Sequence, residues 1–180
     1  MHPRRAKREQ QTMPNDDGPC MGTIVSPVGI NGTVRIMPRA VDPERFIRCD
    51  KLCFADGTKV HLKKQKLSRG GTVTAKIIGC DDRNVAEALR KKELFLGEES
   101  RTSLGEDDLQ DLSILSMRVV DDSGEELGVI ESIRDFGAGS ILELKLQPSG
   151  KRVYIPYNKD AVTNINFETG TMAVNTEFLV

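Results

Sequence analysis

The chain has 180 residues, 38% hydrophobic and 29% charged, and could form one large or two small domains with buried cores. No apolar run approaches the roughly 18 residues that a membrane-spanning helix requires, which excludes such a helix. The basic N-terminal segment MHPRRAKREQQ is not followed by an apolar stretch, so we expect no secretory signal. We therefore expect a cytoplasmic protein that has no membrane partner.

Charge is divided unevenly along the chain. Residues 21–101 hold sixteen basic and ten acidic side chains, a net charge of +6. Residues 102–180 hold six basic and fourteen acidic ones, a net charge of −8. This asymmetry indicates two domains with oppositely charged partners, a phosphate backbone for one and a basic protein for the other. Two merely solvated halves would give the same distribution.

The stretch SPVGINGTVRI, residues 26–36, predicts a β-hairpin and not a nucleotide-binding loop. A P-loop needs a Lys followed by Ser or Thr at the start of a helix, whereas Gly32 precedes an alternating, β-branched run. Asn31-Gly32 is the dipeptide favoured where both central residues of a turn have positive φ. In the strand that follows, Arg35 alternates with apolar neighbours and should face away from them.

Further turn signals predict two more hairpins in this half, in ADGTKV at residues 55–60 and in RGGTVTAKIIG at residues 69–79. One segment, DDRNVAEALRKKEL at residues 81–94, predicts a helix that Asp82 or Asn84 can cap. Its expected apolar stripe is Val85, Ala86 and Leu89, and the basic residues near its end are Arg90, Lys91 and Lys92. The first half is therefore expected to be a small β-barrel with one helix.

The second half begins with residues 97–113, which are acidic, polar and without a sustained period, as is typical of an exposed linker. Short strands then alternate with turn signals, and the three leucines of ILELKL at residues 141–146 share one face. The stretch DFGAGS predicts a turn that contains Phe136. We expect a second compact all-β barrel with little helix.

The four cysteines, Cys20, Cys49, Cys53 and Cys80, do not have the spacing of a zinc site, because no second close pair accompanies Cys49 and Cys53. We expect reduced, partly buried thiols and predict no metal, no cofactor and no catalytic residue. The sequence alone does not exclude a Cys–His nucleophile pair that includes His61, because such partners need only be adjacent in space.

Four ordered segments resemble the RimM family of ribosome maturation factors. They are GTIVSPVGINGTVRI at residues 22–36, DRNVAEALRKKELFL at 82–96, VVDDSGEELGVIESIRDFGAGSILELKL at 119–146 and RVYIPYNKDAVTNINFETGTMAV at 152–174. The resemblance implies a mainly all-β fold with a translation-factor-like barrel that carries one short helix, followed by a PRC-type barrel. The expected parts are a basic, disordered tail (1–19), the RimM N-terminal barrel (20–101), a linker (102–112) and the PRC-type barrel (113–180).

The resemblance also implies a function. It indicates a non-enzymatic assembly factor that binds the precursor of the 30S ribosomal subunit near its head and promotes 16S rRNA processing. We also expect a monomer. The implied partners are the nineteenth protein of the small-subunit series and 16S rRNA. Two alternatives are a generic adaptor whose acidic C-terminal barrel engages a basic protein unrelated to the ribosome, and an enzyme that uses a cysteine.

The candidate partner-binding residues come from the matched segments and their departures from the family pattern. They are Gly29, Asn31, Gly32, Arg35, Arg90, Lys91, Lys92, Leu109, Gln110 and Phe136. Leu109 and Gln110 stand where the family usually has adjacent aromatic residues tied to partner docking, and Gln110 does not replace a ring. The run Lys63, Lys64 and Lys66 and the tail residues Arg4, Arg5, Lys7 and Arg8 are further candidates for phosphate contacts. Solvation, turn formation and helix-dipole compensation are the alternative explanations of these residues.

Overall fold

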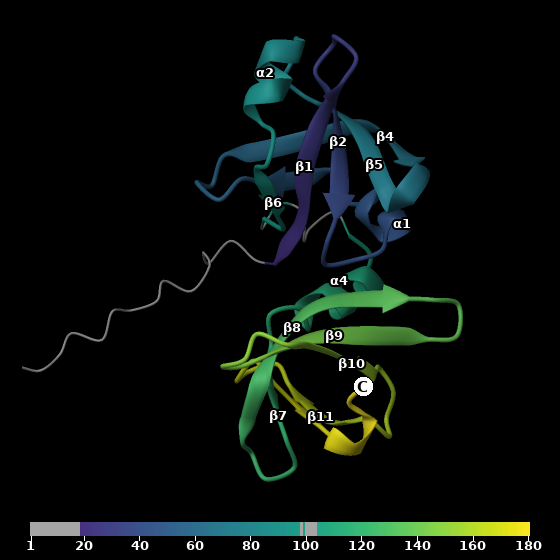
Figure 1. Ribbon diagram of the computed structural model, residues 1–180, viewed down its shortest axis with the longest axis vertical. Helices are drawn as coiled ribbons and strands as arrows, with labels where there is room; N and C mark the ends of the chain where they lie inside the picture. Colours follow the sequence, from purple (N-terminus) through teal and green to yellow (C-terminus); the bar gives the residue numbers. More distant parts are fainter. Residues whose placement is uncertain (1–18, 98, 100–103) are drawn as a thin grey trace, which may run out of the picture.

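The computed structural model describes residues 19–97, 99 and 104–180, and it contains two six-stranded β-sheets, one above the other in Figure 1. The predicted basic tail lies outside the described residues except for residue 19, as do Arg4, Arg5, Lys7 and Arg8. No helix in the described ranges is long and apolar enough to cross a bilayer.

The first sheet is a closed barrel with the strand order β1-β2-β5-β4-β3-β6. Its strands are β1 (Cys20–Val28), β2 (Thr33–Pro38), β3 (Lys51–Cys53), β4 (Lys59–Ser68), β5 (Thr72–Ile77) and β6 (Glu93–Phe95). Alternate residues point inward, so that Val34 and Ile36 are fully buried while Arg35 between them is exposed. The three predicted hairpins and the outward orientation of Arg35 are confirmed. The short helices α1 (Pro43–Phe46) and η1 (Arg69–Gly71) lie between strands and were not expected.

The turn of the first hairpin differs from the prediction. The residues with positive φ are Gly29, at 67°, and Gly32, at 75°, and Asn31 is not among them. At Gly32 an added Cβ would lie 1.9 Å from the carbonyl oxygen of Cys80. Glycine at this position therefore permits both the backbone conformation and the close packing of the turn on Cys80.

The predicted helix over residues 81–94 is shorter in the structure, where α2 spans Arg83–Ala88. Asp82 caps it by accepting a hydrogen bond from the N–H of Val85 at 2.9 Å, as expected, but the Val85 side chain is 44% exposed and not part of a buried stripe. The chain turns at Lys91, whose φ is 69°, and the N–H of Lys91 donates to a carbonyl of β1 at 2.8 Å. Pairing with β1 thus ends the helix, and the prediction that it reaches Leu94 is wrong.

The second sheet has the order β10-β9-β8-β7-β12-β11, and all its neighbouring pairs are antiparallel except β12 with β7. Its elements are β7 (Arg118–Val120), β8 (Glu126–Asp135), β9 (Ser140–Leu146), β10 (Arg152–Pro156), β11 (Val162–Asn166), β12 (Thr171–Val174) and η2 (Thr176–Phe178). On β9, Leu142 and Leu144 are fully buried, while Leu146 on the same face is half-buried. The mainly β fold with two β units is confirmed.

The segment that we interpreted as a linker contains helix α4 (Glu106–Ser113), although residues 102 and 103 lie outside the described part. Three acidic residues in its first turn favour the helix N-terminus, and Leu112 is buried against the core. Val41 and Cys49 from the barrel and Leu112 line a cavity of about 10 Å³, so α4 packs closely between the two sheets. The domain boundaries at residues 101 and 113 stay a prediction.

Candidate macromolecular interface

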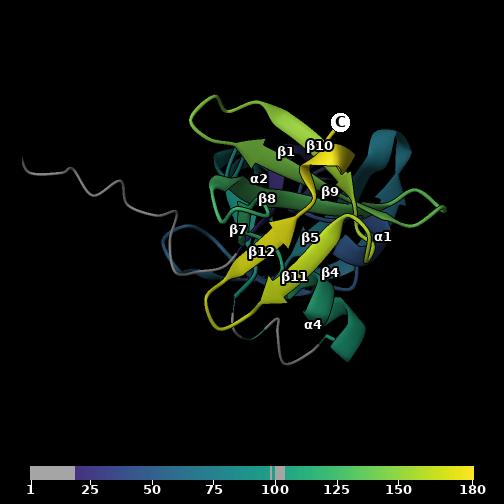
Figure 2. The ribbon, with the colours of Figure 1, turned by 90° about the horizontal axis from the view of Figure 1, so that it is seen from below.

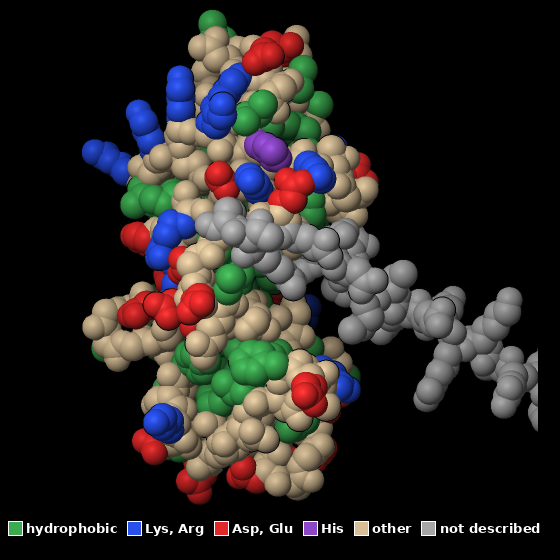
Figure 3. Space-filling view, turned by 180° about the vertical axis from the view of Figure 1, so that it is seen from behind, with side chains coloured by type: hydrophobic (Ala, Val, Ile, Leu, Met, Phe, Trp, Pro, Cys, Tyr) green, Lys and Arg blue, Asp and Glu red, His purple; other side chains and the backbone are tan. Residues whose placement is uncertain are grey.

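Cations gather on the outer surface of the barrel, over β2, β5 and β4. The strand register pairs Arg35 with Thr74, and Thr74 with Lys66 on the other side. In a neighbouring row Lys76 is paired with Lys63. Because outward side chains on adjacent strands lie beside one another, these residues form one surface. We call Arg35, Lys63, Lys66 and Lys76 the basic face, and Figure 3 shows Lys and Arg side chains projecting from this side of the barrel.

Most of the positive charge on the basic face is uncompensated. Arg35, Lys63 and Lys66 are exposed, and no ion pair involves them among the described residues. Lys64 and Arg69 lie next to the face and are also exposed, with Lys64 at a β-bulge where φ is 52°. Free cations spread over a sheet surface suit a phosphate backbone, which carries regularly spaced negative charge.

Lys76 has a different role because its ammonium group is engaged. It forms an ion pair with Asp81 at 3.2 Å and donates to the carbonyl oxygens of Asn31 and Cys80. Arg83 of α2 donates to the carbonyl oxygen of Gly29 at 3.1 Å. The predicted candidates Gly29, Asn31 and Gly32 are therefore held next to the basic face by their backbone. Sequence reasoning missed Lys76, and only the register reveals it.

The predicted cations Arg90, Lys91 and Lys92 are not part of the basic face. They lie in the turn after α2, beside β1, which is opposite β4 in the ring of six strands. Arg90 is 3.5 Å from the carboxylate of Glu87, and the Lys92 ammonium lies 4.9 Å from the centre of the Phe54 ring. The structure thus divides the predicted cations into two groups on opposite sides of the barrel.

The other three candidates lie outside the barrel. Leu109 and Gln110 are on α4, where Leu109 is half-buried and Gln110 is exposed. Phe136 lies in the turn between β8 and β9 and is 69% exposed. This turn extends away from the body of the sheet in Figure 1, and the N–H of Asp135 at its base donates to Asp42 Oδ2 at 3.0 Å. An exposed ring on a protruding turn is accessible to a partner.

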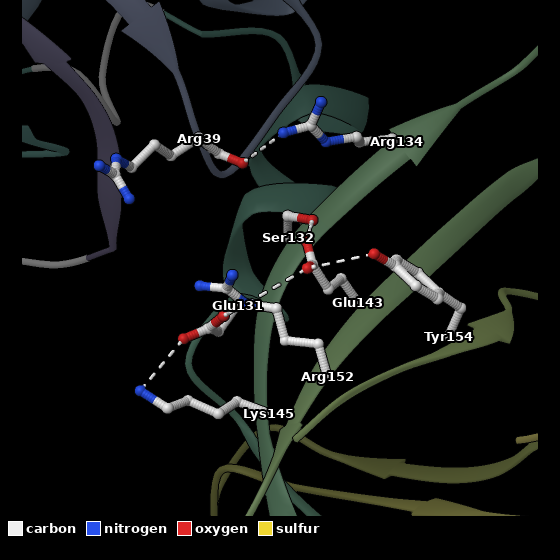
Figure 4. A network of polar contacts seen from close by, with 8 residues as sticks. All are labelled: Arg39, Glu131, Ser132, Arg134, Glu143, Lys145, Arg152 and Tyr154. Atoms are coloured by element: carbon white, nitrogen blue, oxygen red, sulfur yellow. Dashed lines mark hydrogen bonds and ion pairs between the residues drawn. The ribbon is translucent and has the colours of Figure 1, made fainter. Parts of the chain in front are cut away.

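A polar network covers one face of β8, β9 and β10, as Figure 4 shows. Arg152 Nε lies 2.9 Å from Glu131 Oε2 and 3.4 Å from Glu143 Oε1, and Ser132 donates to Glu143 Oε2 at 3.0 Å. Lys145 is 3.6 Å from Glu131. Both carboxylates are therefore neutralised by cations, and the cluster stabilises the sheet surface without presenting an unpaired acid–base pair.

The cysteines lack the features of an activated nucleophile. All four are free thiols, and Cys49, Cys53 and Cys80 are buried. Burial raises the pKa of Cys20 to about 11 and that of Cys49 to about 12, so that both stay protonated at neutral pH. His61 Nε2 lies 3.7 Å from the Glu99 carboxylate. In the described ranges no group of three or more His, Cys, Asp or Glu side chains could hold a metal ion.

These features define a two-part β protein with an uncompensated cationic surface on its first part. The sequence-family model of the RimM N-terminal domain matches residues 20–101, and the family model of the RimM PRC barrel domain matches residues 111–176. The chain therefore belongs to the RimM family.

Curated relatives agree with this assignment. The ribosome maturation factor RimM of Ehrlichia ruminantium (strain Gardel) is 33% identical over 153 residues, which cover 84% of this chain and 88% of that protein. The ribosome maturation factor RimM of Wolbachia sp. subsp. Drosophila simulans (strain wRi) is 30% identical over 162 residues, which cover 89% of this chain and 96% of that protein. A crystal structure of a RimM protein from Pseudomonas aeruginosa is 23% identical with a TM-score of 0.41, and the match covers 87% of this chain and 95% of that one.

Proposed function

We propose that this protein is a non-catalytic, monomeric ribosome maturation factor of the cytoplasm. It binds immature 30S subunits near their head and promotes the processing of 16S rRNA. The proposal is supported by the family match over both parts of the chain and by relatives that are named ribosome maturation factors.

The basic face is the structural observation that carries the proposal. Arg35, Lys63 and Lys66 have no acidic partner in the described part of the chain, so rRNA phosphates can take that place. Contacts of this kind position a protein on RNA without reading its sequence. The protein thus acts by holding a folding intermediate of the subunit, and the chemical steps of processing belong to other molecules.

The C-terminal sheet supplies a second contact. Residues 102–180 have a net charge of −8, which suits a basic ribosomal protein, and the nineteenth protein of the small-subunit series is the proposed partner. Phe136, 69% exposed, is the proposed aromatic anchor. Leu109 adds a smaller apolar contact from α4, and Gln110 adds no ring.

Sedimentation of the purified protein with 30S precursors tests the proposal. We expect co-sedimentation at low salt that weakens steeply as salt rises, because each phosphate contact releases counterions. Cells that lack the gene should accumulate 16S rRNA precursors. Absence of association at every salt concentration would refute the proposal. Association that survives nuclease treatment, with normal rRNA processing in the deletion strain, would instead indicate an adaptor unrelated to the ribosome.

A further inference from the structure

The two edge strands of the C-terminal sheet differ in whether their outer backbone groups are hydrogen-bonded. At the β10 edge, Tyr154 and Val180 exchange backbone hydrogen bonds of 2.9 and 3.0 Å, so the C-terminal residue covers that strand. At the other edge, β11 pairs with β12 and with no other strand in the part of the chain that the structure describes. Within the described ranges, the backbone of residues 163–166 makes no hydrogen bond beyond those of its pairing with β12. The outer N–H and C=O groups of β11 are therefore available for pairing.

The sequence of β11 contains none of the usual devices that protect an edge strand. Val162–Asn166 reads VTNIN, with no proline and no charged side chain. Natural sheets commonly use Lys, Pro or a covering segment at such an edge to prevent pairing with another chain. An unprotected edge of this composition is suited to accept an additional strand.

A depression of about 380 Å³ lies beside this edge. Tyr157, Val162 and Ile165 supply its apolar lining, and Asn158 and Asn164 are among its polar residues. Figure 2 places β11 and α4 on the same side of the molecule. Figure 3 views that side and shows apolar side chains gathered on the C-terminal sheet, next to acidic ones. The depression offers room for an apolar side chain from a strand paired with β11.

The acidic residues around the β11 edge favour a positively charged partner. Asp160 precedes β11 and Glu168 follows it; both are exposed, and neither forms an ion pair with a described residue. Burial raises the pKa of Tyr157, and the negative charge of Asp111 on α4 adds a smaller upward shift. Lys159 is the cation next to these groups. Carboxylates at both ends of an open strand favour a positively charged segment.

We propose that β11 binds an extended segment of a basic polypeptide by strand addition. The backbone of the segment pairs with β11, an apolar side chain enters the depression, and cationic side chains approach Asp160 and Glu168. The inference rests on the proposed function in that the polypeptide belongs to the immature small subunit. It adds the mode of recognition, through main-chain hydrogen bonds at one edge of the sheet.

Amide hydrogen exchange of the full chain, alone and saturated with purified 30S precursors, tests this inference. We expect outward-facing amides within residues 163–166 to exchange at least about tenfold more slowly in the complex, because they gain hydrogen-bond acceptors. The amides of Tyr154 and Val180 are already paired and should change little. Wild-type protein that binds precursors without protection in β11 would overturn the inference and leave the proposed function intact.

A pair of lysine substitutions gives an independent readout. Asn164→Lys places a cation on the open edge, where it should repel a basic segment and weaken precursor binding about tenfold or more. Ser149→Lys, in the exposed turn before β10 at the opposite edge, should bind within about twofold of wild type. Both variants should keep the wild-type circular dichroism spectrum and Tm. Equal binding by the two variants would contradict strand addition at β11.

Two remaining outcomes are also decisive. A wild-type protein that binds no precursor at any salt would refute the proposed function and, with it, this partner. A dimer in sedimentation velocity that protects the same β11 amides without precursors would assign the edge to a second copy of the chain and overturn the inference.

Discussion

The backbone N–H of Ile133 on β8 donates to the carbonyl oxygen of Ala40, 2.9 Å away, and both residues are fully buried. β8 is longer than β7, so along its second half this edge of β8 does not pair with β7, and the loop between β2 and α1 of the barrel lies against it. Arg134 reinforces the contact by donating to the carbonyl oxygen of Arg39 at 3.2 Å, as Figure 4 shows. These two hydrogen bonds join the barrel to the C-terminal sheet.

The ion pairs at this junction should differ in their effect on stability. Arg45 and Asp111 lie 2.7 Å apart with side chains only 19% and 23% exposed, and Arg45 Nη1 is buried without a hydrogen-bond partner among the described residues. Burial raises the pKa of Asp111 more than Arg45 lowers it, so the pair itself adds little. Asp111→Ala should nevertheless cost about 1–3 kcal/mol, measured by urea unfolding, because it leaves the Arg45 guanidinium without its partner.

Asp108→Ala is the matched control on the same helix. The Asp108 side chain is as buried as that of Asp111, at 17% exposed, but its partner Arg48, 2.9 Å away, is 53% exposed, so solvent screens the pair from the arginine side. The expected loss is below about 1 kcal/mol. Equal losses for the two variants would show that burial at the junction does not control the contribution of these pairs.

Two glycines of the first turn should respond differently to alanine. At Gly32, φ is 75° and a Cβ would lie 1.9 Å from the Cys80 carbonyl oxygen, so Gly32→Ala combines backbone strain with overpacking and should cost about 2–5 kcal/mol. At Gly29, φ is 67° but a Cβ would meet no atom of the described residues within 4 Å, so Gly29→Ala should cost about 1–2 kcal/mol. Denaturant unfolding of both variants measures the difference. A larger loss at Gly29 would contradict the close packing of Gly32 on Cys80.

Charge-reversal substitutions should show which of the two cationic sides of the barrel binds 30S precursors. Lys63→Glu with Lys66→Glu should weaken binding to 30S precursors about tenfold or more and lower the salt dependence, because phosphate contacts are lost from the basic face. Arg90→Glu with Lys91→Glu makes the same change in charge on the opposite side. Filter binding at several salt concentrations compares the two double variants. A stronger effect of the second pair would show that the RNA contact does not lie on β4.

Cys49 should give the protein a pH-dependent stability in the alkaline range. Burial raises the pKa of this thiol from its ordinary value of 9.0 to about 12, so it ionises in the unfolded chain before it does so in the native protein. The unfolded state therefore binds fewer protons above pH 9, and stability falls as the pH rises from about 9 towards 12. Cys49→Ala removes this contribution.

The comparison is made by urea unfolding at pH values from about 8 to about 10.5. The wild type should lose stability faster than Cys49→Ala, by up to about 1.4 kcal/mol per pH unit above pH 9. Because other groups titrate equally in both proteins, the difference between the two curves isolates the thiol. Parallel curves would contradict burial of Cys49 as the cause of its raised pKa.

Local pattern was enough to predict the β units and part of the candidate site. The leucines of β9 alternate with polar residues, turn dipeptides mark three hairpins, and Arg35 stands between two apolar residues of one strand. Each of these signals depends on neighbours within a few residues, where backbone geometry and side-chain period determine the outcome. Asp82, one of the two residues that the sequence offered as the helix cap, was predictable for the same reason.

Tertiary contacts determined the rest, because they join residues far apart in the chain. Pairing with β1 ends α2 before Leu94, and packing at the junction orders α4 within the expected linker. Only the register across β5 places Arg35 in one row with Lys66, and only Val180 decides which edge of the second sheet is covered. By itself the sequence determined which segments are strands and where charge accumulates along the chain. Only the folded chain decided which charged residues lie side by side and which edge strand stays unpaired, because local periodicity does not specify which distant residues come close in space.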